Sequence, residues 1–188
     1  KVPPDTLNLS LERIYDQGKW LEQLSGKLMT LALMQGKIVT RPERVSKLLG
    51  AVAETTADAL GERGMTLALD CGIDTLPMDF DLMRSALTNL VMNAMKASAD
   101  GQTITLTARD RTIEVADHGA GISPEDLSRV TEPFYMADRS RSKKHGGAGL
   151  GLALVKKIAE AHGARLAIES VLGRGTTVRI EFGTGGVE

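Results

Sequence analysis

Two asparagines and a lysine lie close together in one stretch of the chain. Asn89 and Asn93 are four positions apart, and Lys96 follows three positions later. Residues at such spacings share one face of a helix. An amide oxygen is a suitable ligand for Mg²⁺, which prefers oxygen donors, and a lysine ammonium can meet a phosphate as a point charge. The spacing therefore indicates a metal and phosphate site, with a solvated polar helix face as the alternative.

An aspartate followed by two glycines suggests a second kind of contact. Asp117 precedes Gly119 and Gly121. Glycine permits positive φ angles and lets a ligand approach the backbone closely. A carboxylate at this point could accept a hydrogen bond from an exocyclic amine such as the adenine amino group. The alternative is a turn aspartate that supports its own backbone.

A glycine-rich run, residues 146–151, opens a predicted helix. Such turns expose backbone N–H groups that bind phosphate at a helix N-terminus, whereas flexible hinging is the competing use. The eleven residues before this run carry four basic residues and one acidic residue. They are either a solvated loop or a lid over a phosphate. We expect Phe134 to anchor this lid in the core, a plain core aromatic being the alternative, and residues 173–176 to form a hairpin turn.

These residues need elements that position them. A heptad stripe predicts a long helix over residues 6–35, and a lone helix of this kind needs a partner to cover the stripe. Pairing in a helical bundle is favoured over packing on the rest of the chain. The stripe consists of Leu7, Ile14, Leu21, Leu24, Leu28 and Leu31.

The remainder alternates helices with hairpins. Helices are predicted from Pro42 to a cap at Gly64, after a cap at Asp79, at Ser123–Pro124, and over residues 150–161 with a cap at Gly163. Strands are predicted at residues 65–69, 102–108, 112–116, 165–169 and 176–182. Because hairpins link the strands, the order favours an α+β fold, a two-layer sandwich with helices on one face of a mixed sheet.

Composition sets limits on the class of protein. The chain has 188 residues, of which 42% are hydrophobic and 25% charged, and the net charge of -1 gives no attraction to nucleic acid. The single cysteine excludes an internal disulfide framework and favours a cytoplasmic location. No apolar run is long enough for a membrane span. Because the chain starts at Lys1 without a signal pattern, we expect a piece of a longer protein, which could itself be membrane-anchored.

Together and in this order, the motifs resemble the catalytic and ATP-binding domain of sensor histidine kinases, within the gyrase, chaperone, histidine kinase and MutL superfamily. The resemblance covers about residues 40–183 and implies a Bergerat-type fold. Residues 6–35 are similar to the second helix of the family's dimerisation and phosphoacceptor hairpin, which divides the chain into residues 1–36 and 37–188. The matching segments are the N box at residues 87–94, the glycine boxes at 117–122, 147–152 and 173–177, and the F box at 132–134.

The resemblance also implies roles for individual residues. Asn93 would ligate Mg²⁺, with Asn89 on the phosphate side and Lys96 assisting. Asp117 would bind the adenine amine, partly through water to Thr176. The backbone N–H groups of the second glycine box would hold phosphate. The remaining residues implied in nucleotide binding are Gly119, Gly121, Ile122, Phe134, Gly147, Gly149, Leu150, Gly151 and Leu152.

The implied activity is transfer of the γ-phosphoryl group of Mg-ATP to a histidine, on a helix of the same or the sister subunit, and onward to a response regulator receiver domain. No histidine precedes His118, so the acceptor is expected outside this chain. Ala97 stands where many relatives place an aromatic, which predicts looser base binding. Two alternatives stay open: a serine kinase of the anti-sigma type, which the heptad helix disfavours, and a non-catalytic scaffold that signals by conformation.

Overall fold

The computed structural model describes residues 38–136 and 149–183, together with scattered positions between residues 11 and 29, which are helical. The helices are α2 (Val45–Gly61), α3 (Phe80–Ala97), α4 (Pro124–Leu127) and α6 (Gly151–Ala161). The strands are β1 (Arg41–Arg44), β2 (Thr66–Cys71), β3 (Thr75–Met78), β4 (Thr103–Arg109), β5 (Thr112–Ala116), β6 (Ala164–Val171) and β7 (Gly175–Phe182).

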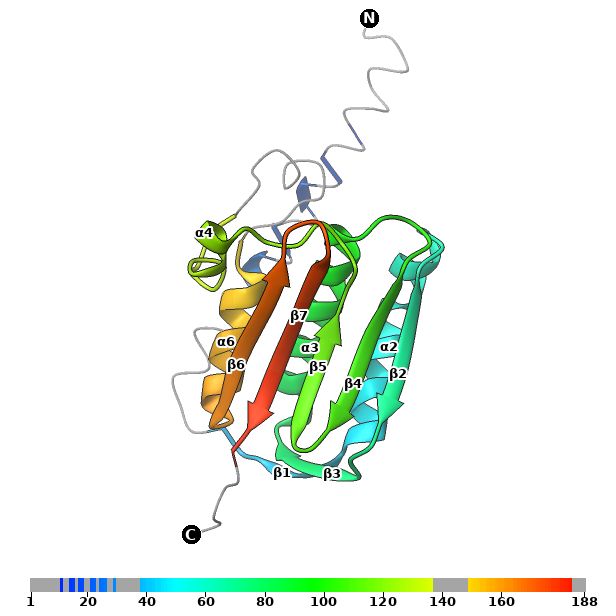
Figure 1. The fold of residues 1–188 in the computed structure, drawn as a ribbon. Coiled ribbons are helices and arrows are strands. Elements are labelled where there is room, and N and C mark those ends of the chain that lie inside the picture. Colours follow the sequence, from blue (N-terminus) through cyan, green and yellow to red (C-terminus); the bar gives the residue numbers. More distant parts are fainter. Residues whose placement is uncertain are drawn as a thin grey trace, which may run out of the picture.

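Five strands form one mixed sheet in the order β2-β4-β5-β7-β6. Only β2 and β4 are parallel; the other neighbours are antiparallel. Helices α2, α3 and α6 cover one face of this sheet (Figure 1). The predicted α+β sandwich is therefore confirmed.

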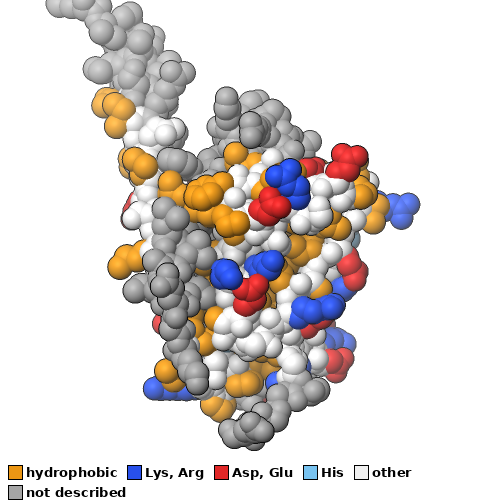
Figure 2. Space-filling view, turned by 90° about the vertical axis from the view of Figure 1, so that its left-hand side faces the viewer, with side chains coloured by type: hydrophobic (Ala, Val, Ile, Leu, Met, Phe, Trp, Pro, Cys, Tyr) orange, Lys and Arg blue, Asp and Glu red, His pale blue; other side chains and the backbone are white. Residues whose placement is uncertain are grey.

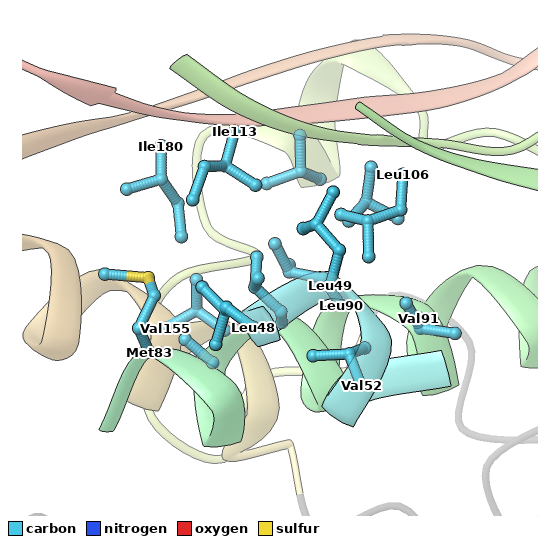
Figure 3. Close-up of a cluster of buried hydrophobic side chains, with 14 of the residues drawn as sticks. Leu48, Leu49, Val52, Met83, Leu90, Val91, Leu106, Ile113, Val155 and Ile180 are labelled. Carbon is cyan, nitrogen blue, oxygen red and sulfur yellow. The ribbon is translucent and has the colours of Figure 1, made fainter. Parts of the chain in front are cut away.

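The core lies between the sheet and these three helices. Every second residue of β4, β5 and β7 is buried, as a sheet with one covered face requires. Leu106, Ile113 and Ile180 of the sheet point toward Leu48 of α2 and Val155 of α6 (Figure 3). This aliphatic layer holds α3 and α6, which carry the candidate site, at a fixed height above the strands.

Several predicted helix ends are confirmed. Asp79 caps α3, because its Oδ1 accepts a hydrogen bond from the backbone N–H of Leu82 at 3.0 Å. Ser123 caps α4 in the same way, with its Oγ 3.1 Å from the N–H of Asp126. Gly64 and Gly163 follow α2 and α6 with φ angles of 60° and 63°. Local capping chemistry thus sets these ends.

The predicted helix start at Pro42 is wrong. Residues 41–44 form β1 and pair antiparallel with β3, a strand that was not predicted, so α2 begins at Val45. Pro42 stands opposite Pro77 in this ladder. Neither proline has an N–H to donate, so the two form a pair without backbone hydrogen bonds, as the edges of a short sheet allow. The strands β6 and β7 also extend further than predicted.

The N-terminal helix carries exposed apolar side chains. Ile14 is 68% exposed and Leu21 is 57% exposed, and apolar side chains of this segment lie on the surface shown in Figure 2. Leu24 is half-buried. The other members of the heptad stripe lie outside the described residues. In the part of the chain that the structure describes, no helix is both long and apolar enough to cross a membrane.

Candidate nucleotide-binding site

The N-box asparagines meet the first residue of α6. A Cβ placed on Gly151 would lie 3.3 Å from Asn93 Nδ2, 3.5 Å from Asn93 Oδ1 and 3.6 Å from Asn89 Oδ1. The amide of Asn89 is oriented by its own helix, because Nδ2 donates to the Ser85 carbonyl at 2.8 Å and so leaves Oδ1 as an acceptor. The predicted metal-ligand face of α3 and the glycine-rich start of α6 therefore lie side by side.

Asp117 follows β5 and is buried, with 8% of its surface exposed. Its Oδ1 accepts hydrogen bonds from the N–H of Gly119 at 2.8 Å and of Thr176 at 3.3 Å. Burial raises the pKa of this carboxyl, and the two backbone N–H groups act in the opposite direction. Among the described residues, no donor is bonded to Oδ2. One carboxylate oxygen is thus held by the turn, while the other can accept from a ligand.

The first glycine turn lies directly on the end of α3. A Cβ on Gly119 would lie 2.4 Å from the Ala97 carbonyl oxygen, and the N–H of Ala120 donates to that oxygen at 3.0 Å. A Cβ on Gly121, where φ is 68°, would lie 2.2 Å from the Val171 carbonyl oxygen. These glycines are therefore required for close packing of one backbone on another, beyond any approach of a ligand.

The third glycine box packs on the same aspartate. Gly175 has a φ of 119°, and a Cβ there would lie 2.0 Å from the Asp117 carbonyl oxygen. The N–H of Asp117 in turn donates to the Thr176 carbonyl at 2.9 Å. Thr176 and Asp117 are thus brought together from positions 59 residues apart.

Phe134 does not anchor a lid in the core. Its side chain is 63% exposed, so the predicted core anchor and the alternative of a plain core aromatic are both wrong. Its φ is 65°. Its backbone contributes instead: the N–H of Phe134 donates to the Gly149 carbonyl at 2.9 Å. A Cβ on Gly149 would lie 2.7 Å from the Phe134 carbonyl carbon. The F box and the second glycine box are therefore joined through main chain.

Tyr135 is the aromatic anchor that the sequence did not reveal. Its hydroxyl donates to Asp126 Oδ1 at 2.6 Å, and the Arg129 guanidinium lies 4.3 Å from the ring centroid. The hydrogen bond lowers the pKa of the Asp126 carboxyl and raises that of the Tyr135 hydroxyl. The residue that follows the F box is thereby tied to α4.

The remaining predicted residues fall into three groups. Lys96 is an exposed residue in the last turn of α3, yet nearby protein atoms partly desolvate its ammonium and lower its pKa. Leu150 is buried and Leu152 half-buried, so Leu150 can meet a ligand only through its backbone. Gly147 and the basic residues of the expected lid lie outside the described residues.

Ser170 was also missed by the sequence analysis. Its Oγ accepts a hydrogen bond from the N–H of Ile122 at 2.8 Å and lies 2.9 Å from Thr176 Oγ1. The hydroxyl therefore connects the first and third glycine boxes. A serine inside a strand pattern gives no sign of such a contact, which spans 48 residues.

Comparison with known proteins decides the family. A family model described as histidine kinase-, DNA gyrase B-, and HSP90-like ATPase matches residues 78–185. The chain belongs to this ATPase family. Sensor protein SrrB of Staphylococcus aureus (strain NCTC 8325 / PS 47) is 32% identical over 187 residues, which cover 95% of this chain and 32% of that protein. The chain thus spans about a third of the length of the curated relatives it matches.

Solved histidine kinases have the same fold. The structure of full-length ShkA in complex with AMPPNP matches with a TM-score of 0.74 and 26% identity, over 96% of this chain and 38% of that one. Acinetobacter baumannii histidine kinase AdeS matches with a TM-score of 0.71 and 23% identity, over 98% of this chain and 88% of that one. Within its family, the chain is a sensor histidine kinase ATPase domain.

Proposed function

We propose that this domain binds Mg-ATP between α3, the Asp117 turn, the β6–β7 turn and the start of α6, and donates the γ-phosphoryl group to a histidine on a bundle helix outside this chain. The observation that carries the proposal is the approach of Asn93 to Gly151. It puts an oxygen ligand beside the N-terminus of an eleven-residue helix. Helix N-termini attract phosphate through their dipole and free N–H groups.

The donor set suits the metal. Asn89 Oδ1 and Asn93 Oδ1 both come within 3.6 Å of the point where a Gly151 Cβ would lie. Amide oxygens are hard ligands of the kind that Mg²⁺ accepts alongside water. Bound Mg²⁺ would neutralise charge on the transferring phosphoryl group. Asn93 is assigned as the ligand, Asn89 as its neighbour on the phosphate side, and Lys96 as a further cation for the phosphates.

The base end is formed by Asp117. Its Oδ1 is held by Gly119 and Thr176, so Oδ2 can accept a hydrogen bond from the adenine amine. Thr176 contributes through water, and Ile122 lines the turn. The backbone N–H groups of the second glycine box, residues 147–152, hold the phosphates. AMPPNP in the full-length ShkA structure, an ATP analogue on a chain of this fold, supports nucleotide binding here.

The phosphoryl acceptor is assigned to a helix outside this chain, of the same or the sister subunit. The chain contains three histidines, and none precedes residue 118. We assign residues 1–36 to the bundle and residues 37–188 to the catalytic domain. The phosphoryl group then passes to an aspartate on a response regulator receiver domain, in the cytoplasm.

Calorimetry tests the nucleotide site. The chain should bind ADP more tightly with Mg²⁺ than without, and Asn93→Ala should remove most of that difference while leaving metal-free binding in place. Arg84→Ala, an exposed change on the same helix, is the matched control. An equal response of Asn93→Ala and Arg84→Ala to Mg²⁺ would remove Asn93 as the ligand. No heat from ADP with wild-type protein would favour the scaffold alternative.

A phosphotransfer assay tests the reaction. The chain is incubated with γ-labelled ATP, alone and with a separate bundle fragment that carries a histidine from a relative. The label should appear on the bundle fragment at an acid-labile site, and the chain alone should stay unlabelled. Acid-stable labelling of a serine on a partner would favour the anti-sigma type of kinase instead.

A further inference from the structure

The hydroxyl of Ser170 has three polar neighbours. Ser170 is the penultimate residue of β6, and its Oγ accepts a hydrogen bond from the Ile122 N–H at 2.8 Å. The same Oγ lies 3.0 Å from the Gly175 carbonyl oxygen and 2.9 Å from Thr176 Oγ1. Ile122 belongs to the first glycine box, and Gly175 and Thr176 belong to the third, at the start of β7.

Counting hydrogens fixes the direction of each bond. A serine hydroxyl has one hydrogen and two lone pairs. The Gly175 carbonyl can only accept, so Ser170 must donate its hydrogen there. The Thr176 hydroxyl must then donate its hydrogen to Ser170 Oγ. The reverse assignment would leave lone pairs of Ser170 and Gly175 facing each other at 3.0 Å, with no hydrogen between them.

This count determines what Thr176 can offer a ligand. Its only hydroxyl hydrogen goes to Ser170, so Oγ1 has just lone pairs for other partners. Its neighbour Asp117, when ionised, is also an acceptor only. The two side chains at the base end of the proposed site therefore both require donors.

We propose that Ser170 is a specificity-determining positioning residue, which holds Thr176 as an acceptor and thereby favours a 6-amino purine over a 6-oxo purine. The inference rests on the proposed nucleotide site and deepens it. Adenine presents an amine with two hydrogens at this edge, whereas a 6-oxo purine presents a lone-pair oxygen. An oxygen facing two acceptors stays unpaired. A water between them does not change this, because it gives its two hydrogens to Asp117 and Thr176 and keeps only lone pairs for the base. An unpaired buried polar group is penalised more than a paired one is rewarded.

The test compares ADP with inosine diphosphate, which share ribose and phosphates but differ at position 6. Both are titrated into the full chain by calorimetry with Mg²⁺. The wild type should prefer ADP, and Ser170→Ala should reduce that preference about tenfold. The freed Thr176 hydroxyl can then donate to the 6-oxo group, or to the water before it, which leaves a water hydrogen for that group. Ser170→Thr keeps a hydroxyl on a residue that suits strands and should retain the preference. The ratio is informative because general loosening would weaken both nucleotides alike.

A double mutant separates this role from a purely structural one. In a Thr176→Val background, Ser170→Ala should leave the ratio of the two affinities unchanged, because no hydroxyl is left to reorient. Ser170→Cys keeps the side-chain volume with a weak donor, and should lower the preference if the alanine variant does not fold.

Two results would overturn the inference while leaving the nucleotide site in place. One is an ADP preference that survives both Ser170→Ala and Ser170→Cys. The other is an equal fall in preference with valine at position 176, which would mean that Ser170 acts through the backbone. A wild-type chain that binds neither nucleotide would overturn the proposed site itself, and this inference with it.

Discussion

The imidazole of His162 bonds to the residue that caps α3: its Nε2 accepts a hydrogen bond from the backbone N–H of Asp79 at 3.0 Å. The other ring nitrogen, Nδ1, lies 2.7 Å from the Ile158 carbonyl oxygen. A carbonyl only accepts, so Nδ1 carries the hydrogen and Nε2 the lone pair. This contact joins the end of α6 to the start of α3. At the opposite ends of the same two helices, Asn93 meets Gly151.

Replacing His162 by phenylalanine should destabilise the domain. The new ring can keep the edge contact with Phe182, now 6.4 Å between centroids, but both hydrogen bonds are lost. The Ile158 carbonyl keeps the backbone N–H of residue 162, but the part-buried N–H of Asp79 is left unpaired. This should lower the free energy of unfolding by about 1–3 kcal/mol in urea titrations. Lys157→Ala, an exposed change on α6, should cost less than about 0.5 kcal/mol. Equal losses in the two variants would contradict the proposed contact.

Arg63 should contribute more to the stability of the domain than another arginine with a similar ion pair. Its Nε lies 2.6 Å from Asp100 Oδ1, its Nη2 donates to the Ser98 carbonyl at 2.9 Å, and its Nη1 donates to the Met95 carbonyl. These carbonyls close α3 next to the Asp117 turn. Arg63→Met should therefore lower the free energy of unfolding by about 1–3 kcal/mol and weaken ADP binding.

Arg109→Met is the matched control for that change. Arg109 also lies 2.6 Å from an aspartate, Asp70, but both side chains are more than half exposed, and its guanidinium donates to no carbonyl of the described residues. Exposed pairs contribute about 0–1 kcal/mol. The two variants should differ clearly in chemical denaturation; indistinguishable midpoints would show that the carbonyl contacts of Arg63 add nothing.

Alanine at Gly175 and at Gly173 should have different effects, although both glycines have a positive φ. The positive φ itself costs about 1–2 kcal/mol per residue with a side chain. At Gly173 a Cβ would meet no atom within 4 Å, whereas at Gly175 it would lie 2.0 Å from the Asp117 carbonyl oxygen. Thermal unfolding should show a moderate loss for Gly173→Ala and a much larger one for Gly175→Ala. ADP binding should survive only in the former.

The buried carboxyl of Asp117 predicts a pH dependence of stability. Burial raises its pKa above the ordinary value of 3.8, so the folded state favours the protonated form. The stabilisation from this group is complete below pH 3.8 and is lost as pH rises through the higher pKa of the folded state. Asp117→Asn removes the titration. Relative to this variant, wild-type protein should become less stable in urea titrations as the pH rises above the ordinary carboxyl pKa of 3.8.

A difference that stays constant with pH would falsify this assignment. In the same samples, Asp117→Asn should bind ADP at least about tenfold more weakly, because an amide nitrogen replaces one acceptor oxygen. Lower stability at neutral pH combined with ligand binding is typical of groups that serve function rather than folding.

Local patterns predicted much of the fold. The Asp79 and Ser123 caps, the β4–β5 hairpin and the left-handed Gly163 depend on residues a few positions apart, so the sequence contains the necessary information. The β1–β3 pair was missed because its ladder places Pro42 opposite Pro77, and prolines argue against strands.

In the candidate site, too, local features could be predicted and long-range contacts could not. The motif residues could be found because each has a recognisable task. Asparagine and aspartate act through their side chains, and glycine acts by having none. Ser170, Arg63 and His162 could not, because their roles depend on partners 48, 35 and 83 residues away. Phe134 was misplaced for a related reason: its motif marks a backbone contact with Gly149, whereas its ring suggested burial.

The bare glycines of the two turns limit how this domain can be redesigned. At Gly119, Gly121 and Gly175 the space that a Cβ would need is taken by a neighbouring peptide group. No library of substitutions at these three positions could tune ligand choice, because each variant would have to push two chain segments apart. Ligand contacts made by the main chain of these turns are determined by the fold itself. Changes in nucleotide preference, and mutations that confer resistance to an inhibitor, are therefore expected at the side chains that hold these segments in place.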